Sequence, residues 1–261
     1  MEPSLGRAIA TRGPAAAAAA MATAAAPADL AAAGANTATR LTSIDKVANR
    51  LIAASATQAG FRSMVAPESR LLDVSSEAID LVKAIAKCGK QVVLVDWSLD
   101  GTGYAAALGL PSKPGITDLL QGDVSFEDVI ARVPGSEAHF IASGDALVDP
   151  AMAGDADRLN LVLDALDEAY DHIVVAGNHE ASRALFQAIE GRFDAGITVA
   201  DPKRRQPLIE DEPGSFLGFA VSDLEVIQFD RISGAAAPSA APAKRTVAGR
   251  TLGGPAAEAR T

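Results

Sequence analysis

The sequence predicts an α/β fold, with a doubly wound, mostly parallel sheet flanked by helices in three layers. Two observations lead to this prediction. Short runs such as Gln91–Val95 and Ile173–Ala176 have the unbroken apolar character of strands that are buried on both faces. Segments with apolar residues at helical spacing alternate with these runs. Strand–helix–strand units of this kind imply parallel strands joined by right-handed crossovers.

The elements follow one another in a regular order. Thr42 or Ser43 can cap the first helix, and Ser75 or Ser76 can cap the second, which ends at Gly89. The final strand is expected at an edge of the sheet. The predicted elements are a helix over 44–52, a strand over Phe61–Val65, a helix over 76–88, a strand over Gln91–Val95, a helix over Phe126–Val133 capped by Ser125, a strand over Ala138–Ala142, a helix over Leu159–Tyr170, a strand over Ile173–Ala176, a helix over Ala181–Ile189, and strands over Gly196–Ala200 and Leu224–Phe229.

Composition divides the chain into three parts. Residues 1–40 and 232–261 are rich in Ala, Gly and Pro. They contain few bulky apolar groups to offset the entropy of ordering the backbone, so we expect both segments to be disordered. Residues 41–231 have ordinary complexity and are expected to form one domain.

Charge and cysteine content exclude several classes of protein. The chain has 33 acidic and 23 basic side chains, a net charge of -10, which argues against a nucleic-acid binder. The single cysteine, Cys88, excludes an internal disulfide and fits a reducing compartment. The longest uncharged run, between Arg12 and Asp29, is mostly alanine and lacks the large apolar residues of a membrane span or a signal peptide. We therefore expect a cytoplasmic protein.

One segment is similar to a known family. From Gly109 the chain reads GLPSKPGITDLLQGDVSFEDVI, and this follows an apolar strand that ends in Asp96. The segment Gln91–Ile130 resembles the cytoplasmic domain of bacterial tyrosine autokinases of the capsular and exopolysaccharide type, which are ParA/MinD-like P-loop ATPases. A looser similarity extends over Phe61–Ala200. The resemblance implies a P-loop NTPase-like fold and, in active members, ATP with magnesium.

The resemblance also implies what the first loop should contain. A phosphate-binding loop needs a glycine-rich turn, a lysine for the phosphates and a Ser or Thr hydroxyl for magnesium. The corresponding loop, Ala66–Ala78, has no glycine and no lysine. Val74 stands in the lysine position, and Ser75 and Ser76 stand in the hydroxyl positions. The two serines can be remnants of a phosphate loop or simply helix caps.

The next two strand ends should supply carboxylates. Asp96 keeps the first position after the strand, but Ser98 occupies the second, with Asp100 nearby as a displaced substitute. Asp96 can hold a metal or cap the turn that follows it. Ala176 stands where the Walker B strand of the family has its acidic residue. Asp96 and Asp100 are therefore the only catalytic candidates, and no metal site is predicted.

The resemblance leads to two hypotheses about function. The family's kinases phosphorylate a tyrosine cluster at their end, whereas this chain contains only Tyr104 and Tyr170. The leading hypothesis is a catalytically degenerate relative that regulates exopolysaccharide biosynthesis or export. It would bind a membrane polysaccharide co-polymerase or an active kinase paralogue, self-associate, and bind ATP weakly if at all. The alternative is an active ATP-dependent tyrosine kinase that uses the serines and aspartates named above.

A third hypothesis rests on a different motif. Gly177–Glu180 reads GNHE, as in calcineurin-like metallophosphoesterases, and Gly144–Asp145 with Asp149 resembles their GDxxD element. Two-metal sites of this kind need several histidines. The first element would have to be Asp96–Ser98, which contains no histidine, and no histidine follows His179. This hypothesis therefore lacks most of its ligands.

Overall fold

The computed structural model describes residues 38–56, 60–99, 103–145, 155–189, 191–201 and 215–231. The strands are β1 (Thr39–Leu41), β2 (Phe61–Pro67), β3 (Val92–Asp96), β4 (Ile130–Arg132), β5 (His139–Ile141), β6 (His172–Ala176), β7 (Ala195–Ala200), β8 (Ser215–Phe216), β9 (Phe219–Ala220) and β10 (Glu225–Asp230). The helices are α1 (Ile44–Ala54), α2 (Ser75–Lys87), α3 (Ala105–Leu108), α4 (Ile116–Gln121), α5 (Phe126–Val129), α6 (Ala156–Asp167) and α7 (His179–Ala188).

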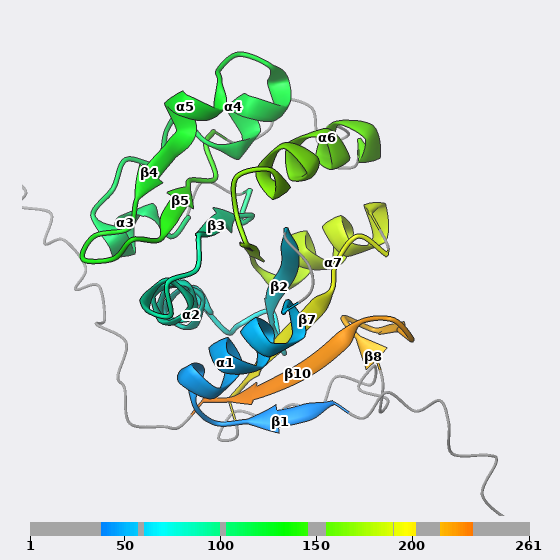
Figure 1. Ribbon diagram of the computed structural model, residues 1–261. Helices are drawn as coiled ribbons and strands as arrows, with labels where there is room; N and C mark the ends of the chain where they lie inside the picture. Colours follow the sequence, from blue (N-terminus) through cyan, green and yellow to red (C-terminus); the bar gives the residue numbers. More distant parts are fainter. Residues whose placement is uncertain are drawn as a thin grey trace, which may run out of the picture. The chain divides into compact units, whose positions relative to one another are not determined.

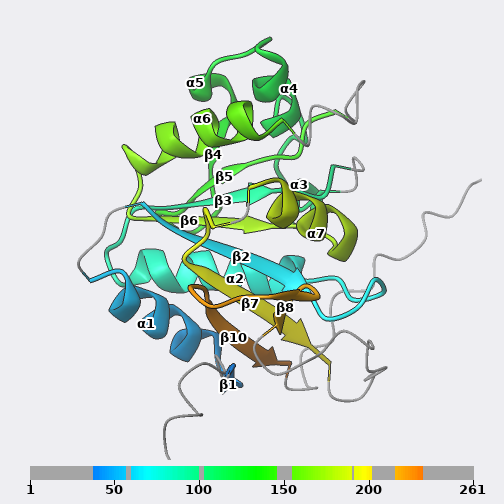
Figure 2. The same cartoon turned by 90° about the vertical axis from the view of Figure 1, so that its right-hand side faces the viewer.

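Eight strands form one sheet in the order β1-β10-β7-β2-β6-β3-β5-β4. All neighbours are parallel except β4, which runs antiparallel to β5. Helices α1 and α2 lie on one side of the sheet, and α6 and α7 lie on the other (Figures 1 and 2). The predicted fold class, a doubly wound, mostly parallel sheet between two helical layers, is confirmed. Among the described residues, no helix is long and apolar enough to cross a lipid bilayer.

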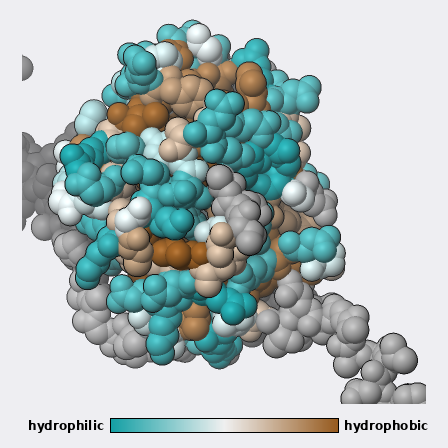
Figure 3. Space-filling model, viewed as in Figure 1, coloured by the Kyte–Doolittle hydropathy of each residue, from teal (hydrophilic) through white to brown (hydrophobic). Residues whose placement is uncertain are grey.

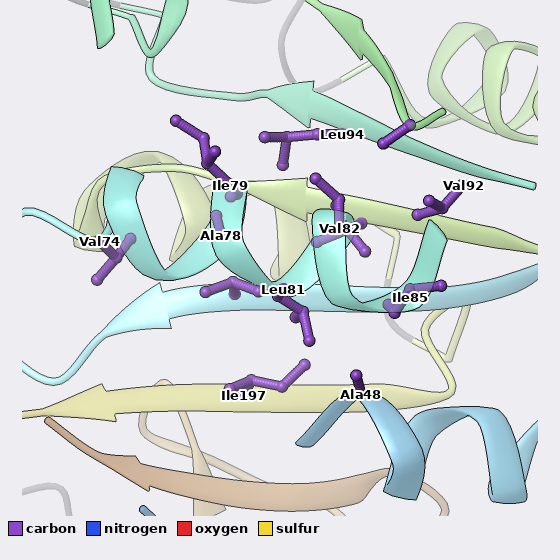
Figure 4. Close-up of a cluster of buried hydrophobic side chains, with 14 of the residues drawn as sticks. Ala48, Val74, Ala78, Ile79, Leu81, Val82, Ile85, Val92, Leu94 and Ile197 are labelled. Carbon is purple, nitrogen blue, oxygen red and sulfur yellow. The ribbon is translucent and has the colours of Figure 1, made fainter. Parts of the chain in front are cut away.

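The central strands are apolar because both of their faces are covered. Every residue of β2, β3 and β6 is buried. On one face, α2 presents a stripe of apolar residues to the sheet, and Figure 4 shows Leu81, Val82 and Ile85 of this stripe among the side chains of the strands. The opposite face is covered by a second apolar cluster that includes Trp97. Burial on both faces accounts for the unbroken apolar runs in the sequence.

The prediction of one helix over Phe126–Val133 is wrong. Helix α5 ends at Val129, and the chain then continues as β4, whose residue Ile130 pairs with Ile141 of β5. Ser125 is the N-cap residue of α5 as predicted, and its amide donates to the side chain of Asp128 in a capping box. Tertiary pairing with β5 therefore overrides the helical pattern after the first turn.

The prediction that Leu224–Phe229 is an edge strand is also wrong in part. A strand does form, as β10, but it lies between β7 and β1. The edge is formed by β1, whose residues Thr39 and Leu41 pair with Ile227 and Phe229. A strand as short as β1 carries no pattern by which it could be predicted.

Helices α6 and α7 begin earlier than predicted because polar caps precede them. The carboxylate of Asp155 accepts a hydrogen bond from the amide of Arg158 at 3.2 Å. The side chain of Asn178 accepts one from the amide of Ala181 at 2.9 Å. Both contacts satisfy amide groups in the first turn that have no partner within the helix. Helix α6 also ends earlier than predicted, before Tyr170.

His172, the first residue of β6, is a buried histidine. Its Nε2 atom lies 3.1 Å from Ser55 Oγ, and its ring centroid lies 5.7 Å from that of Phe61. Burial lowers the pKa of His172 from 6.5 to about 4. The side chain is therefore neutral at pH 7 and acts as part of the core.

We expect acid to destabilise the protein through His172. As the pH falls from 6.5 to about 4, the unfolded chain takes up a proton that the folded chain does not. The free energy of unfolding should fall by about 3 kcal/mol over this range because of this group. Urea titrations at several pH values measure the effect. His172→Gln should flatten the pH dependence, and the matched variant His139→Gln should retain it; equal slopes for both variants would contradict the assignment.

Candidate functional site

A pocket of about 260 Å³ lies at the carboxyl ends of three adjacent strands, β2, β6 and β3. In doubly wound sheets this edge is where ligands bind. The loops after Val65, Val95 and Ala176 meet here as the fold predicts, while the described residues after Ala142 do not line this pocket. The lining residues are Arg70, Leu71, Leu72, Asp73, Val74, Ser98, Tyr104, Gly177 and Asn178.

The loop between β2 and α2 caps its own helix. The amide and hydroxyl of Ser75 both donate to the carboxylate of Asp73, each at 2.9 Å. The hydroxyl of Ser76 donates to Glu77 at 2.9 Å. The prediction that Ser75 or Ser76 caps α2 is wrong, because both lie within the helix, Val74 is the N-cap residue, and Asp73 makes the capping contact. The carboxylate of Asp73 thus lies at the amino end of the helix, where an anion is favoured.

Val74 has a structural role in the core. Its side chain is only 2% exposed and lies in the apolar cluster between α2 and the sheet. Figure 4 shows Val74 at the start of α2, near Ala78 and in the same cluster as Ile197. A lysine at this position would have to leave this apolar environment to reach a phosphate.

The loop after β3 is organised around Asp96. This carboxylate is fully buried and accepts hydrogen bonds from Ser98 N at 3.0 Å, Ser98 Oγ at 2.7 Å and Tyr104 N at 2.7 Å. A Cβ atom at Gly103 would lie 2.3 Å from Asp96 Oδ2, so only glycine allows this close approach. Asp96 therefore fixes the turn, as one of the two interpretations of the sequence proposed. The second candidate, Asp100, lies outside the described residues.

The loop after β6 joins the other two. Ala176 is fully buried at the end of the strand, where the resemblance places a carboxylate. Two residues later, Asn178 Nδ2 donates to the carbonyl oxygen of Ser98 at 3.1 Å, while its oxygen caps α7. Asn178 thus uses both ends of its amide to hold two loops together.

The segment that carries the family resemblance closes over the end of β5. The amides of Ile116 and Thr117 donate to the carbonyl oxygens of Ala142 and Ser143, at 2.8 and 3.2 Å. Gly115 is buried between these stretches of chain, since a Cβ atom there would lie 2.2 Å from the amide nitrogen of Gly144. The segment therefore supports the sheet edge, and its small residues are needed for close backbone contact.

The residues of the phosphoesterase motif have other contacts. Asn178 is the helix cap described above, and His179 is the first residue of α7. Asp145 forms an ion pair with Lys113, and Asp149 lies outside the described residues. Within the described ranges, no group of three or more His, Cys, Asp or Glu side chains is placed to hold a metal ion.

The pocket has little charge of its own to offer a ligand. Arg70 forms an ion pair with Glu180, and the carboxylate of Asp73 accepts a hydrogen bond from the hydroxyl of Ser75. The remaining lining is apolar or contributes amide and hydroxyl groups. Such a pocket can hold a small polar molecule by hydrogen bonds, but it presents no lysine to a phosphate. The sequence analysis did not single out Arg70 or Asp73. An aspartate two residues before the start of a helix is a signal that could have indicated Asp73.

Both tyrosines of the chain are buried. Tyr104 is 7% exposed and Tyr170 is 6% exposed. The hydroxyl of Tyr170 lies 2.8 Å from His139 Nδ1, and burial raises the pKa of Tyr170. Neither hydroxyl is presented for phosphorylation.

Comparisons with known proteins support the resemblance seen in the sequence. Over 98 residues, or 37% of this chain, it is 28% identical to the tyrosine-protein kinase ptk of Acinetobacter johnsonii. It is 35% identical over the same length to the putative tyrosine-protein kinase EpsB of Ralstonia nicotianae. The match spans only 13% of the length of each relative. No family model matches the chain.

Solved structures confirm the fold. The kinase domain of Escherichia coli tyrosine kinase ETK aligns with a TM-score of 0.57 and 15% identity, covering 75% of this chain and 78% of that one. The kinase domain of VpsO aligns with a TM-score of 0.57 and 21% identity, covering 72% of this chain and 96% of that one. The chain therefore has the fold of these tyrosine kinase domains, and its resemblance to bacterial tyrosine kinases is confirmed.

Proposed function

We propose that this chain, which is similar in sequence to bacterial tyrosine kinases and shares the fold of their kinase domains, is a catalytically degenerate member of that group. It would act in the cytoplasm, through protein contacts, in exopolysaccharide biosynthesis or export. The partner would be a membrane polysaccharide co-polymerase or an active kinase paralogue. The domain over residues 41–231 would make these contacts, with residues 1–40 and 232–261 as disordered flanks.

The observation that carries the proposal is the loop between β2 and α2. Its helix is capped by Asp73, and the side chain in the lysine position, Val74, is buried in the core. Losing a cationic group that stabilises a transferring phosphoryl group costs several kcal/mol of transition-state stabilisation, roughly 3 or more. The residues of the pocket therefore do not fit a magnesium nucleotide, and we derive no phosphoryl transfer from them.

Two further observations support the loss of kinase activity. Ala176 carries no carboxylate, and the carboxylate of Asp96 is fully buried and accepts hydrogen bonds from Ser98 and Tyr104, so neither position presents a magnesium ligand to the pocket. Tyr104 and Tyr170 are both buried, so the chain offers no tyrosine among its own residues as a substrate. These observations disfavour an active kinase. The experiment below distinguishes that alternative from the degenerate protein proposed here.

A protein that acts by contact needs a surface for its partner. In the space-filling view, apolar residues gather at the top of the face that is seen in Figure 1, over α4 and α5 (Figure 3). Leu119, Val124 and Phe126 of this region are only partly buried against the core. This region belongs to the segment that carries the sequence resemblance. We therefore regard it as the first candidate for the surface that binds the partner protein.

We expect the purified chain to form no phosphotyrosine with MgATP and to bind the cytoplasmic segment of a co-polymerase equally well with and without MgATP. Calorimetry measures the binding, and anti-phosphotyrosine blotting measures the activity. The kinase domain of Escherichia coli ETK serves as the positive control. A double variant, Ser75→Ala with Ser76→Ala, should behave like the wild type, since the two hydroxyls donate to Asp73 and Glu77 at the start of their own helix. Phosphotyrosine that disappears in the double variant would establish the active kinase instead.

A further inference from the structure

The apolar region over α4 and α5 lies next to a further exposed leucine on α6. Leu161 of α6 is 72% exposed, which is unusual for a large apolar side chain. Helix α4 lies beside both α5 and α6 (Figures 1 and 2). We therefore group Leu119, Val124, Phe126 and Leu161 together and call them the α4–α6 surface.

Arg158 fixes α6 against α4 beneath this surface. Its Nη1 atom donates to the carbonyl oxygen of Leu120 at 2.7 Å. That carbonyl belongs to the last turn of α4, where the helix itself supplies no amide partner. Leu161 follows Arg158 by three residues, and residues at this spacing share one side of a helix. The exposed leucine is thus on the side of α6 that carries the contact with α4.

The charge around the α4–α6 surface is acidic. Residues 114–131 contain four acidic side chains and no basic one. Helix α6 has three acidic residues, two of which pair with Arg62. Asp123, Glu127 and Asp157 are exposed. Each of these carboxylates lies next in sequence to an apolar residue of the surface or one helical turn away from it, so negative charge borders the apolar side chains.

We propose that the α4–α6 surface binds a basic amphipathic segment of the partner protein. The apolar residues of the segment would pack on Phe126 and Leu161, and its lysines and arginines would lie beside the exposed carboxylates. Apolar contacts supply most of the affinity in such an interface, and complementary charge selects the partner. The same carboxylates disfavour an anionic lipid surface as the occupant.

A membrane protein would present a segment of this kind. The cytoplasmic stretches beside membrane-spanning helices carry an excess of lysine and arginine. The inference rests on the proposed function for the existence of a membrane partner, and it adds the chemistry by which that partner would be recognised.

Three synthetic peptides test the chemistry of the segment. The first is a helical peptide of leucine and lysine with all leucines on one face, the second has glutamate in place of lysine, and the third has serine in place of leucine. Calorimetry with the full chain should show binding of the leucine–lysine peptide and none of the leucine–glutamate peptide. The serine–lysine peptide should bind roughly tenfold more weakly, because it buries no apolar surface. Equal binding of the two lysine peptides would overturn the proposal.

Two double variants test whether the carboxylates of this surface are responsible. Asp123→Lys with Glu127→Lys should weaken binding of the leucine–lysine peptide by roughly tenfold. The matched control, Asp45→Lys with Asp80→Lys, changes the net charge equally at exposed positions of α1 and α2, on the other side of the sheet. It should change the affinity by less than about twofold. Equal weakening in both double variants would show that only the overall charge of the chain attracts the peptide, and would overturn the proposal.

A pair of leucine variants tests the apolar contact. Leu161→Ser should weaken binding of the leucine–lysine peptide by roughly tenfold, because this side chain is no longer buried by the peptide. Leu71→Ser is the matched control, since Leu71 is 87% exposed but lies at the pocket. Equal effects of the two variants would overturn the proposal. Light scattering measures self-association at the same concentration: a dimer that Leu161→Ser disperses would show that a second copy covers the surface, which also overturns the proposal.

Failure of this inference and failure of the proposed function give different results. A co-polymerase segment that binds the wild type and the surface variants equally well keeps the proposed function and overturns the α4–α6 surface as its site. A chain that binds the leucine–lysine peptide at this surface but binds no co-polymerase segment keeps the recognition chemistry and loses the membrane partner.

Discussion

Gly115→Ala is expected to destabilise the fold by about 4 kcal/mol, because the added methyl group has no space. Its Cβ atom would lie 2.2 Å from the amide nitrogen of Gly144 and 2.4 Å from the carbonyl oxygen of Ala142. Both are backbone atoms at the end of β5, and neither can rotate away. The fluorescence of the single tryptophan, Trp97, which is buried, reports unfolding in urea.

The control for this variant is Gly122→Ala in the same segment. Gly122 ends α4 with φ +83° and has no atom within 4 Å of an added Cβ. Only the left-handed backbone opposes the substitution, which costs about 1 kcal/mol. If both variants lose the same stability, close contact with β5 is not what requires glycine at position 115.

Asp96→Ala should lose about 4 kcal/mol of stability, since it removes a buried carboxylate that accepts hydrogen bonds from Ser98 and Tyr104. The amides of Ser98 and Tyr104 would then be left without these acceptors. Asp96→Asn should lose about 2 kcal/mol, because its NH2 group must face one donor. Urea unfolding measures both variants.

Ser98→Ala is the companion variant for this experiment. It deletes only the hydroxyl bond of 2.7 Å to Asp96 and should cost about 1 kcal/mol. The loss of stability should therefore be largest in Asp96→Ala, smaller in Asp96→Asn and smallest in Ser98→Ala, in the order of the hydrogen bonds lost. Unchanged stability in Asp96→Asn would show that this carboxylate is not a structural residue and would reopen its assignment as a metal ligand.

Much of the fold can be predicted from the sequence, because the central strands are uniform in character. Burial on both faces makes β3 and β6 recognisable without knowledge of their neighbours. The errors occur at the margins of the sheet. At Ile130 the chain changes from helix to strand because it pairs with β5. Strand β10 is internal because the three residues of β1 pair with its outer side. Such long-range pairing leaves no periodic signal in the segment itself.

The site could be predicted in position but not in detail. The order of the elements places the loops after β2, β3 and β6 at one edge, and the pocket lies there. The roles of individual residues depend on contacts across the chain. Nothing in the sequence near Asp73 indicates that Arg231 binds its carbonyl oxygen, and the three bonds to Asp96 depend on a turn that brings Tyr104 back to it.

The parallel pairing of β1 with β10 decides where foreign domains can be attached. Thr39 lies beside Ile227 and Leu41 beside Phe229, so the first strand enters at the amino edge of the sheet, whereas Arg231 follows the last strand at the carboxyl edge, near the pocket. A fluorescent reporter or affinity handle fused ahead of β1 therefore joins the fold at the edge remote from the pocket, while one fused after β10 joins it beside the loop between β2 and α2. Surface immobilisation through the first kind of fusion is the better geometry for binding measurements.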